Sequence, residues 1–270
     1  MSAHVARNAG GRCAAVVACC LLAVAGCTPT PEDVTTPAAQ ARGWQYQLQG
    51  RVDTSVDAAT FIVDGFDVDA ATVADLRDRG RTAICYVNAG ALEDWRPDAD
   101  RYPDEIVGDP LDDWQGERWL DIRATEVLRP ILAERFDTCV GKGFTGVETD
   151  NVDGYSQDSG FDLTGDDQLR FNRMLAELAH ERSLTIGLKN DLDQIDDLVD
   201  EFDFAVNESC VQYRECVALA PFTAQGKPVL HVEYELSTDA FCPVTAPLGF
   251  RSIRKPVALT APVEQCPAPL

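Results

Sequence analysis

Polar and charged residues follow most of the short apolar runs in the sequence, at the position where a buried strand would end. In GVETDNVDGY, residues 146–155, three carboxylates come directly after a small apolar run. Residues that end the other runs in the same way are Asp64, Asn88, Lys189, Asn190, Asn207, Glu208 and Glu233. For any one of them, a helix N-cap or a loop salt bridge is the alternative role. As a set, they predict one polar site that is rich in carboxylates.

Paired carboxylates suffice for glycoside hydrolysis, because one protonates the leaving oxygen while the other attacks the sugar carbon or activates water. Histidine chemistry has little support. Of the three histidines, His4 lies near the N-terminus, His180 in a helix-like segment and His231 inside a strand-like run. A Ser-His-Asp relay and a histidine-rich metal site are therefore disfavoured. The carboxylate mechanism requires no metal or organic cofactor, although clustered carboxylates would suit calcium or magnesium.

Aromatic residues near the same run ends could provide apolar platforms for sugar rings. These are Trp44, Tyr46, Tyr86, Trp95, Trp114, Trp119, Tyr155 and Tyr234. Packing beneath long loops is the alternative role for about half of them. The longest segment between runs, residues 92–121, holds three tryptophans and many acids. Segments of this length are usually functional or disordered, and the aromatic content predicts an ordered lip over the site.

Eight apolar, β-prone runs alternate with helix-like segments. The runs are residues 44–50, 61–66, 82–90, 144–150, 184–190, 204–210, 228–234 and 250–256. Apolar residues at three- and four-residue spacing predict helices over 73–80, 126–143, 167–183 and 194–202. This alternation in 270 residues predicts an α/β fold with a single (β/α)8 barrel, whose catalytic groups come from the C-terminal ends of the strands. A doubly wound open sheet is the alternative, but no glycine-rich phosphate loop follows any run.

The first 26 residues are typical of an export signal, with Arg7 and Arg12 ahead of a short apolar stretch. The stretch ends in VAGC, which resembles a bacterial lipobox, so Cys27 is the expected lipidation site. The protein is then expected to be extracytoplasmic and anchored to the cell membrane; cleavage of an ordinary secretory signal is the alternative. Residues 27–43 are rich in Pro, Thr and Ala, which predicts a flexible linker, and the barrel domain is expected over residues 44–270.

Six cysteines follow the expected lipidation site. They are Cys85, Cys139, Cys210, Cys216, Cys242 and Cys266. An even number in an exported protein predicts disulfides. The sequence does not fix their pairing, although Cys210 with Cys216 and Cys242 with Cys266 are nearest along the chain, which leaves Cys85 with Cys139. A zinc site has no CxxC motif to support it.

The acidic balance limits the partners. The formal net charge is −22, and all 45 acidic residues follow residue 26. Such an excess disfavours nucleic acid and anionic lipid surfaces, and it would concentrate a cationic substrate near the protein. Solubility alone is the alternative explanation.

Several motifs, taken in order, resemble the endo-α-1,4-polygalactosaminidase family, glycoside hydrolase family 114. They are YQLQG, the run end at Asp64, CYVNAGALEDWR, GERWLDIR, KGFTGVETDNVDGY, GLKND, NESC with YREC, and GKPVLHVEY, and they cover about residues 44–235. The resemblance implies a (β/α)8 barrel that hydrolyses α-1,4-linked galactosamine polymers. Deacetylated polygalactosamine is cationic, which agrees with the acidic excess.

The resemblance also implies the catalytic pair, namely Asp150 of the TDN segment and Glu208 of the NES segment. By analogy with barrel glycosidases that use the same two strands, Asp150 is the expected nucleophile and Glu208 the acid/base of a retaining reaction. The expected substrate contacts, or groups that tune the pair, are Asp64, Tyr86, Asp153, Lys189, Asn190, Asn207 and Glu233. Glu148 has the same facing as Asp150 but should lie deeper in the barrel.

The expected protein is therefore an exported, endo-acting hydrolase of galactosamine polymers. Two alternatives stay open: an α-glycosidase of another specificity on the same barrel, and a surface glycan-binding lipoprotein without catalysis. A metal-dependent phosphodiesterase would need a basic phosphate-binding patch, for which Lys189 alone is thin support.

Overall fold

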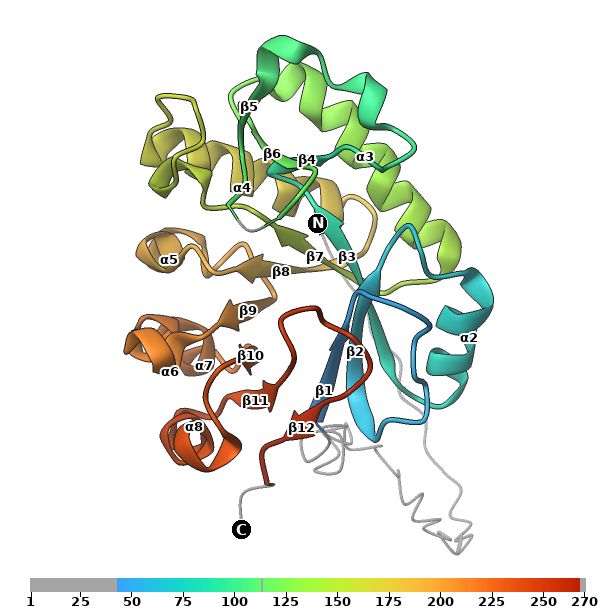
Figure 1. Cartoon of the computed structure of the whole chain (residues 1–270), viewed down its shortest axis with the longest axis vertical. Coiled ribbons are helices and arrows are strands. Elements are labelled where there is room, and N and C mark those ends of the chain that lie inside the picture. Colours follow the sequence, from blue (N-terminus) through green and yellow to red (C-terminus); the bar gives the residue numbers. More distant parts are fainter. Residues whose placement is uncertain (1–42, 113, 268–270) are drawn as a thin grey trace, which may run out of the picture. The chain divides into compact units, whose positions relative to one another are not determined.

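The eight strands expected from the sequence form one parallel sheet in the computed structural model, which describes residues 43–112 and 114–267. In sheet order they are β1 (Gly43–Gln47), β2 (Ala58–Asp64), β3 (Thr82–Asn88), β7 (Gly146–Asp150), β8 (Thr185–Lys189), β9 (Phe204–Glu208), β10 (Val229–Glu233) and β11 (Arg251–Arg254). The short strand β12 (Glu264–Gln265) pairs antiparallel with β11. The sheet is barrel-shaped and nearly closed, with helices on its outer side (Figure 1), which confirms the predicted fold.

Alternate residues of each strand face opposite sides of the sheet. On β3, for example, Ile84 and Tyr86 belong to the inner apolar cluster, whereas Cys85 and Val87 belong to the larger cluster beneath the helices. Strands buried on both faces read as nearly continuous apolar runs, which is why the sequence reveals them.

Side-chain hydrogen bonds link the first strand to the last part of the chain. The indole of Trp44 donates to the carbonyl oxygen of Arg251 at 2.8 Å, and the side-chain amide of Gln265 donates to the carbonyl oxygen of Trp44 at 2.7 Å. On the other face of β1, the Nζ of Lys255 donates to Oε1 of Gln45 at 2.8 Å. The C-terminal segment therefore lies along β1 and brings the barrel close to closure.

Helices connect the strands on the outer face. They are α2 (Ala70–Asp78), α3 (Thr125–Lys142), α4 (Gly165–His180), α5 (Ile195–Leu198), α6 (Cys210–Tyr213), α7 (Ala220–Ala224) and α8 (Thr238–Thr245). Asp69 caps α2 by accepting from the backbone N–H of Thr72, and Thr164 and Asp167 form a capping box on α4. The four predicted helices are confirmed, although α5 is a single turn that follows a 3₁₀ turn at Leu192–Gln194.

The long segment after β3 folds into a small antiparallel sheet. Its strands are β4 (Ala91–Glu93), β5 (Val107–Pro110) and β6 (Glu117–Leu120), in the order β4-β6-β5. Two 3₁₀ turns, Ala99–Arg101 and Asp104–Ile106, lie between β4 and β5. The remaining 3₁₀ turns of the described chain are Gly154–Ser156, Cys216–Leu219 and Ala246–Leu248. The segment is ordered, as the sequence predicted. Its three strands were not predicted.

The six cysteines form three disulfides. Cys85 of β3 bonds to Cys139 of α3, Cys210 bonds to Cys216 after β9, and Cys242 of α8 bonds to Cys266. These bonds confirm the expected disulfides and fix one pairing among those that the sequence left open.

The expected export signal, Cys27 and the expected linker up to residue 42 lie outside the described residues. Strand β1 begins at Gly43, one residue before the expected start of the domain. Among the residues that the structure describes, no helix is both long and apolar enough to cross a membrane.

Candidate active site

Three neighbouring strands end in charged residues that meet at one point. Asp150 ends β7, Lys189 ends β8 and Glu208 ends β9. Because β8 lies between β7 and β9 in the sheet, the lysine lies between the two carboxylates. Its Nζ is 3.0 Å from Oδ1 of Asp150 and 3.3 Å from Oε2 of Glu208. The three side chains therefore form one charge cluster at the C-terminal end of the barrel.

Three groups donate hydrogen bonds to Asp150, namely Tyr86, Asn151 and Lys189. The hydroxyl of Tyr86 donates to Oδ2 at 2.9 Å, and the backbone N–H of Asn151 donates to Oδ1 at 2.8 Å. Burial acts to raise the pKa of Asp150, but the charge of Lys189 and these hydrogen bonds outweigh it and hold the pKa below its usual value. Asp150 is therefore ionised at neutral pH, as a nucleophile must be.

Glu208 is more open to solvent than Asp150, with 30% of its side chain exposed against 19%. The hydroxyl of Tyr234 donates to its Oε1, and Nδ2 of Asn190 lies 3.4 Å from its Oε2. Oδ1 of Asn190 also accepts from the backbone N–H of Glu208 at 3.0 Å. Tyr234 and Asn190 thus position the carboxyl group of Glu208. The same carboxyl group borders the cavity, which suits proton exchange with a bound substrate or water.

Glu148 lies beneath Asp150 on the same face of β7 and is fully buried. Its Oε1 accepts from the hydroxyl of Tyr46 at 2.9 Å and lies 3.6 Å from Nζ of Lys189. Its Oε2 has no hydrogen-bond partner among the described residues. Burial, with the charges of Asp150 and Glu208, raises the pKa of Glu148 to about 8 against the opposing charge of Lys189. The deeper position expected from the sequence is confirmed.

Left-handed backbone conformations follow these strand ends. Asn151, Asn190, Asp191 and Ser209 have φ values of 58°, 49°, 46° and 60°. Such conformations are unfavourable for residues with a side chain, and in proteins they cluster at functional sites. Here they turn the chain sharply after each charged residue, so that the next polar side chains also face the cavity.

A cavity of about 1330 Å³ lies over the charge cluster. The lip segment contributes Trp95, Trp114 and Trp119 to the wall of the cavity, and residues 257–260 also line it. Trp95 and Trp114 are 52% and 47% exposed, which is unusual for tryptophan and suits binding of a ligand face. The acidic residues that line the cavity include Asp109, Asp112, Glu117, Asp153, Asp158, Asp191, Asp193 and Glu215. Volumes of about 300–1,000 Å³ accommodate compact ligands, so this cavity has room for several sugar units.

The structure brings most of the expected site residues to this cavity. Tyr86, Asp150, Asp153, Lys189, Asn190, Asn207 and Glu208 all line it. Asn207 is 1% exposed and donates to Oδ1 of Asn190 at 3.3 Å. It therefore holds Asn190, which contacts Glu208, and its contact with the substrate stays a prediction.

Asp64 borders the cavity, but its carboxylate is already occupied. Nη1 and Nη2 of Arg96 donate to its two oxygens at 3.1 and 2.6 Å, and the backbone N–H of Phe66 donates to Oδ1 at 2.8 Å. Arg96 also binds Glu93 of the lip. Asp64 therefore anchors the lip to the barrel, and a contact of Asp64 with the substrate stays a prediction.

Glu233 was expected to contact the substrate and does not line the cavity. It is fully buried on the outer face of β10, where Oε1 accepts from the backbone N–H of Val211 at 2.9 Å and lies 3.1 Å from Nε2 of His231. The next residue, Tyr234, faces the cavity instead and binds Glu208. The physical reason is the two-residue period of a strand, because Val232 is in the inner cluster and Glu233 must then point outward.

The tyrosines serve the carboxylates directly. Tyr46, Tyr86 and Tyr234 were expected among the sugar platforms, but their hydroxyls donate to Glu148, Asp150 and Glu208 respectively. Burial and the neighbouring carboxylates raise the pKa of all three phenols, so they stay protonated donors. The sequence showed that these tyrosines lie near strand ends. It did not show which carboxylates they contact.

Glu117 of the lip is a site residue that the sequence did not single out. It lines the cavity and accepts from Nδ2 of Asn88 at 2.9 Å. Burial and the charges of Glu93 and Asp150 raise the pKa of Glu117 to about 7. Its place in the GERWLDIR motif was the available signal in the sequence.

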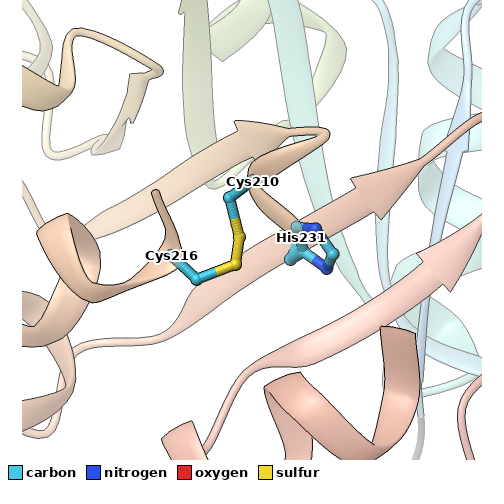
Figure 2. A group of neighbouring side chains, drawn as sticks. All are labelled: Cys210, Cys216 and His231. Atoms are coloured by element: carbon cyan, nitrogen blue, oxygen red, sulfur yellow. A yellow bond between two sulfur atoms is a disulfide. The ribbon is translucent and has the colours of Figure 1, made fainter. Parts of the chain in front are cut away.

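One group of possible metal ligands exists among the described residues. Figure 2 shows Cys210, Cys216 and His231 close together, with the two sulfur atoms joined in a disulfide. A disulfide offers no thiolate, which is the form of cysteine that binds zinc. This group is therefore a structural contact beneath β10.

A parallel barrel with two carboxylates at strand ends, beside a cavity with room for several sugars, defines the class of barrel glycoside hydrolases. The model of glycoside-hydrolase family GH114 matches residues 25–269. The chain belongs to glycoside hydrolase family GH114, and the protein is a glycoside hydrolase. The family resemblance seen in the sequence is confirmed.

Two solved structures illustrate the likeness. The structure of Ega3 from Aspergillus fumigatus in complex with galactosamine is 41% identical, with a TM-score of 0.80, and the match covers 84% of this chain and 95% of that chain. The glycoside hydrolase domain of PelA from Pseudomonas aeruginosa is 15% identical, with a TM-score of 0.66, over 83% of this chain and 98% of that chain. The second likeness concerns the fold alone. No curated protein matches the chain.

Proposed function

We propose that this protein is an exported, endo-acting hydrolase of α-1,4-linked galactosamine polymers that uses Asp150 and Glu208 in a retaining mechanism. The observation that carries the proposal is the buried side chain of Lys189, which contacts both carboxylates at the floor of an acidic cavity. The 41% identical Ega3, solved with galactosamine, supports an amino sugar as the substrate.

The reaction has two steps. Glu208 donates its proton to the glycosidic oxygen while Asp150 attacks the anomeric carbon, so the bond to the leaving sugar breaks and a glycosyl ester forms on Asp150. Glu208, now a carboxylate, then takes a proton from water, whose oxygen attacks the same carbon and releases Asp150. Lys189 and Tyr86 keep Asp150 ionised and oriented before attack.

The spacing of the carboxylates supports retention. Oδ1 of Asp150 and Oε2 of Glu208 lie within 3.0 and 3.3 Å of the same Nζ, so they are no farther apart than the sum, about 6.3 Å. Inverting enzymes hold their carboxyl groups ~6.5–9.5 Å apart to admit a water molecule, whereas retaining enzymes hold them ~5–5.5 Å apart.

The charge of the cavity supports a cationic polymer. Eleven acidic residues line it besides Asp150 and Glu208. Carboxylates in a partly enclosed cavity attract ammonium groups more strongly than they would in open water. The exposed Trp95 and Trp114 on the lip are platforms for sugar rings away from the bond that is cleaved. A cavity with room for several sugars supports cleavage within the polymer chain.

Export and lipid attachment at Cys27 complete the proposal, with secretion as the alternative. The three disulfides of the described residues support it, since such bonds persist in oxidising compartments and are rare in the cytosol. Radiolabelled fatty acid incorporated into the protein, and lost in Cys27→Ala, tests the anchor.

Release of soluble oligosaccharides from partly deacetylated α-1,4-galactosaminan tests the activity. The protein should release them, Asp150→Asn should lose at least about 10⁴-fold in kcat, and Asp196→Asn on the exposed face of α5 should act as the unmodified protein does. Failure of the folded protein to release sugar would contradict the proposed substrate. Full activity of Asp150→Asn would contradict the proposed nucleophile.

A further inference from the structure

Asp191 is a buried carboxylate with half of its acceptor capacity unused. It follows β8 in a left-handed turn, is 4% exposed and lines the cavity. Its Oδ2 accepts from Nδ2 of Asn172 at 2.8 Å, while its Oδ1 has no hydrogen-bond partner among the described residues. An unpartnered buried carboxylate oxygen is unfavourable, so a ligand that donates to it would gain binding free energy.

The orientation of this carboxylate is fixed from behind. Asn172 donates both amide hydrogens, one to Asp191 and one to the carbonyl oxygen of Val152 at 3.0 Å, and its Oδ1 accepts from Nε2 of Gln168 at 2.9 Å. Gln168 and Asn172 are both buried residues of α4. The chain therefore holds Asp191 in one orientation before any ligand arrives, which lowers the entropic cost of binding.

A second carboxylate, Asp153, lies on the same side of the cavity. It follows β7, three residues after Asp150, and lines the cavity with Asp191. Burial and then the charge of Asp153 raise the pKa of Asp191 to about 8, and burial also raises the pKa of Asp153. Within the described chain, neither forms an ion pair with a lysine, arginine or histidine. Asn172 bonds both to Asp191 and to the backbone of Val152, the residue before Asp153, so the two carboxylates border the same part of the cavity, and no described cation pairs with them.

The chemistry of the pair fits a protonated amine better than a metal ion. Because the pKa of Asp191 is raised to about 8, binding of an ammonium group would displace the proton of Asp191. The ammonium group then offers three hydrogen-bond donors and one positive charge to two carboxylates, one of which has an unpartnered oxygen. Calcium needs six to eight oxygen ligands, and magnesium needs an octahedron. Among the described residues, ligand atoms from three acidic or metal-binding side chains come within 4.8 Å only at Cys210, Cys216 and His231 (Figure 2), away from this pair.

We propose that Asp153 and Asp191 form a specificity subsite that binds the protonated 2-amino group of a galactosamine unit next to the cleaved bond. This inference rests on the proposed function, because it names where the amino group of that substrate is read. The subsite adjoins the catalytic residues along the chain, since Asp153 follows Asp150 by three positions and Asp191 follows Lys189 by two. A sugar with its anomeric carbon at Asp150 would place a neighbouring unit beside β7 and β8.

Binding of two matched oligosaccharides tests the subsite. Calorimetry with the Asp150→Asn protein would compare a fully deacetylated α-1,4-galactosamine oligosaccharide with its N-acetylated counterpart, which lacks the positive charge. Adding Asp191→Asn should weaken binding of the deacetylated ligand at least about tenfold and leave the acetylated ligand within about twofold. Asp153→Asn should act in the same direction, and Asp196→Asn should change neither affinity.

The outcomes separate this inference from the proposed function. If the protein cleaves and binds galactosamine oligosaccharides but Asp191→Asn and Asp153→Asn weaken both ligands equally, or neither, then the subsite is wrong and the function stands. If the folded protein neither cleaves nor binds the deacetylated ligand, both are wrong. Asparagine is isosteric with a protonated aspartate and keeps an acceptor for Asn172, so the variants are expected to fold.

Discussion

The Nζ of Lys189 lies 3.0 Å from Oδ1 of Asp150, and no other basic side chain of the described residues contacts that carboxylate. The same Nζ lies 3.3 Å from Glu208. The burial of this lysine acts to lower its pKa, but the surrounding carboxylates raise the pKa well above the usual value. Lys189 therefore stays charged across the physiological range, and it compensates the buried negative charge of Asp150.

Replacing Glu208 by glutamine should separate the two steps of the reaction. Kcat on the polymer should fall about 10²–10⁴-fold, because the leaving oxygen loses its proton donor. An aryl galactosaminide with a good leaving group needs little protonation, so it should still glycosylate Asp150, and azide should restore turnover. Burst kinetics and mass spectrometry would show the trapped glycosyl ester. An equal loss on both substrates would contradict Glu208 as the acid.

Replacing Glu148 by glutamine should matter only at alkaline pH. The pKa of Glu148 is raised to about 8 by burial, so glutamine resembles the protonated side chain that is present below that pH. Kcat/KM should stay within about threefold of the unmodified protein at pH 6, and the variant should lose less activity above pH 8. The pH profiles of both proteins measure this. A hundredfold loss at pH 6 would show instead that the ionised carboxylate is required.

Stability should decline as the pH rises from about 5 to about 8. Folding raises the pKa of Glu117 to about 7 and of Glu148 and Asp191 to about 8, in each case chiefly by burial. The folded state then binds more protons than the unfolded state in this window, so stability is fullest below the unfolded pKa values and is lost towards the folded ones. Thermal unfolding at pH 5 and pH 8 measures the change, and Asp191→Asn should reduce it. A higher Tm at pH 8 would contradict these shifts.

The disulfides should contribute unequally to stability. Cys85–Cys139 closes a separation of 54 residues, whereas Cys210–Cys216 closes 6. Loop-closure entropy then predicts a loss of about 4 kcal/mol for the Cys85→Ala, Cys139→Ala protein and about 2 kcal/mol for the Cys210→Ala, Cys216→Ala protein. Urea unfolding measures both. Since Cys210 follows Glu208 by two residues, the Cys210→Ala, Cys216→Ala protein should lose the larger share of activity. A larger loss of activity in the Cys85→Ala, Cys139→Ala protein would contradict this.

The lip tryptophans should affect substrate binding more than folding. Trp95 and Trp114 are about half exposed and line the cavity. Alanine at either position should raise KM for the polymer about 2–10-fold, the loss expected for one aromatic contact, with kcat and Tm nearly unchanged. Trp44, which is fully buried, is the contrasting control and should destabilise the protein when replaced. Unchanged KM values would exclude these two residues from the binding surface.

Much of the fold and part of the site could be predicted from the sequence. Strands buried on both faces give continuous apolar runs, and all eight runs became parallel strands in sequence order. In a parallel sheet, the residues that end such runs meet at one edge. That rule was enough to bring Asp150, Lys189 and Glu208 together without knowledge of any contact.

The tertiary structure alone decided which of the other run ends belong to the site. Asp64 and Glu233 end their runs as Asp150 does. The carboxylate of Asp64 is bound by Arg96, 32 residues farther along the chain. Glu233 faces outward, to His231 and the backbone of α6. Asp191 gained its unpartnered oxygen from the way α4 packs behind it. Periodicity and run ends are properties of neighbouring residues, whereas pairing, facing and burial depend on contacts between distant segments, which form only when the barrel packs.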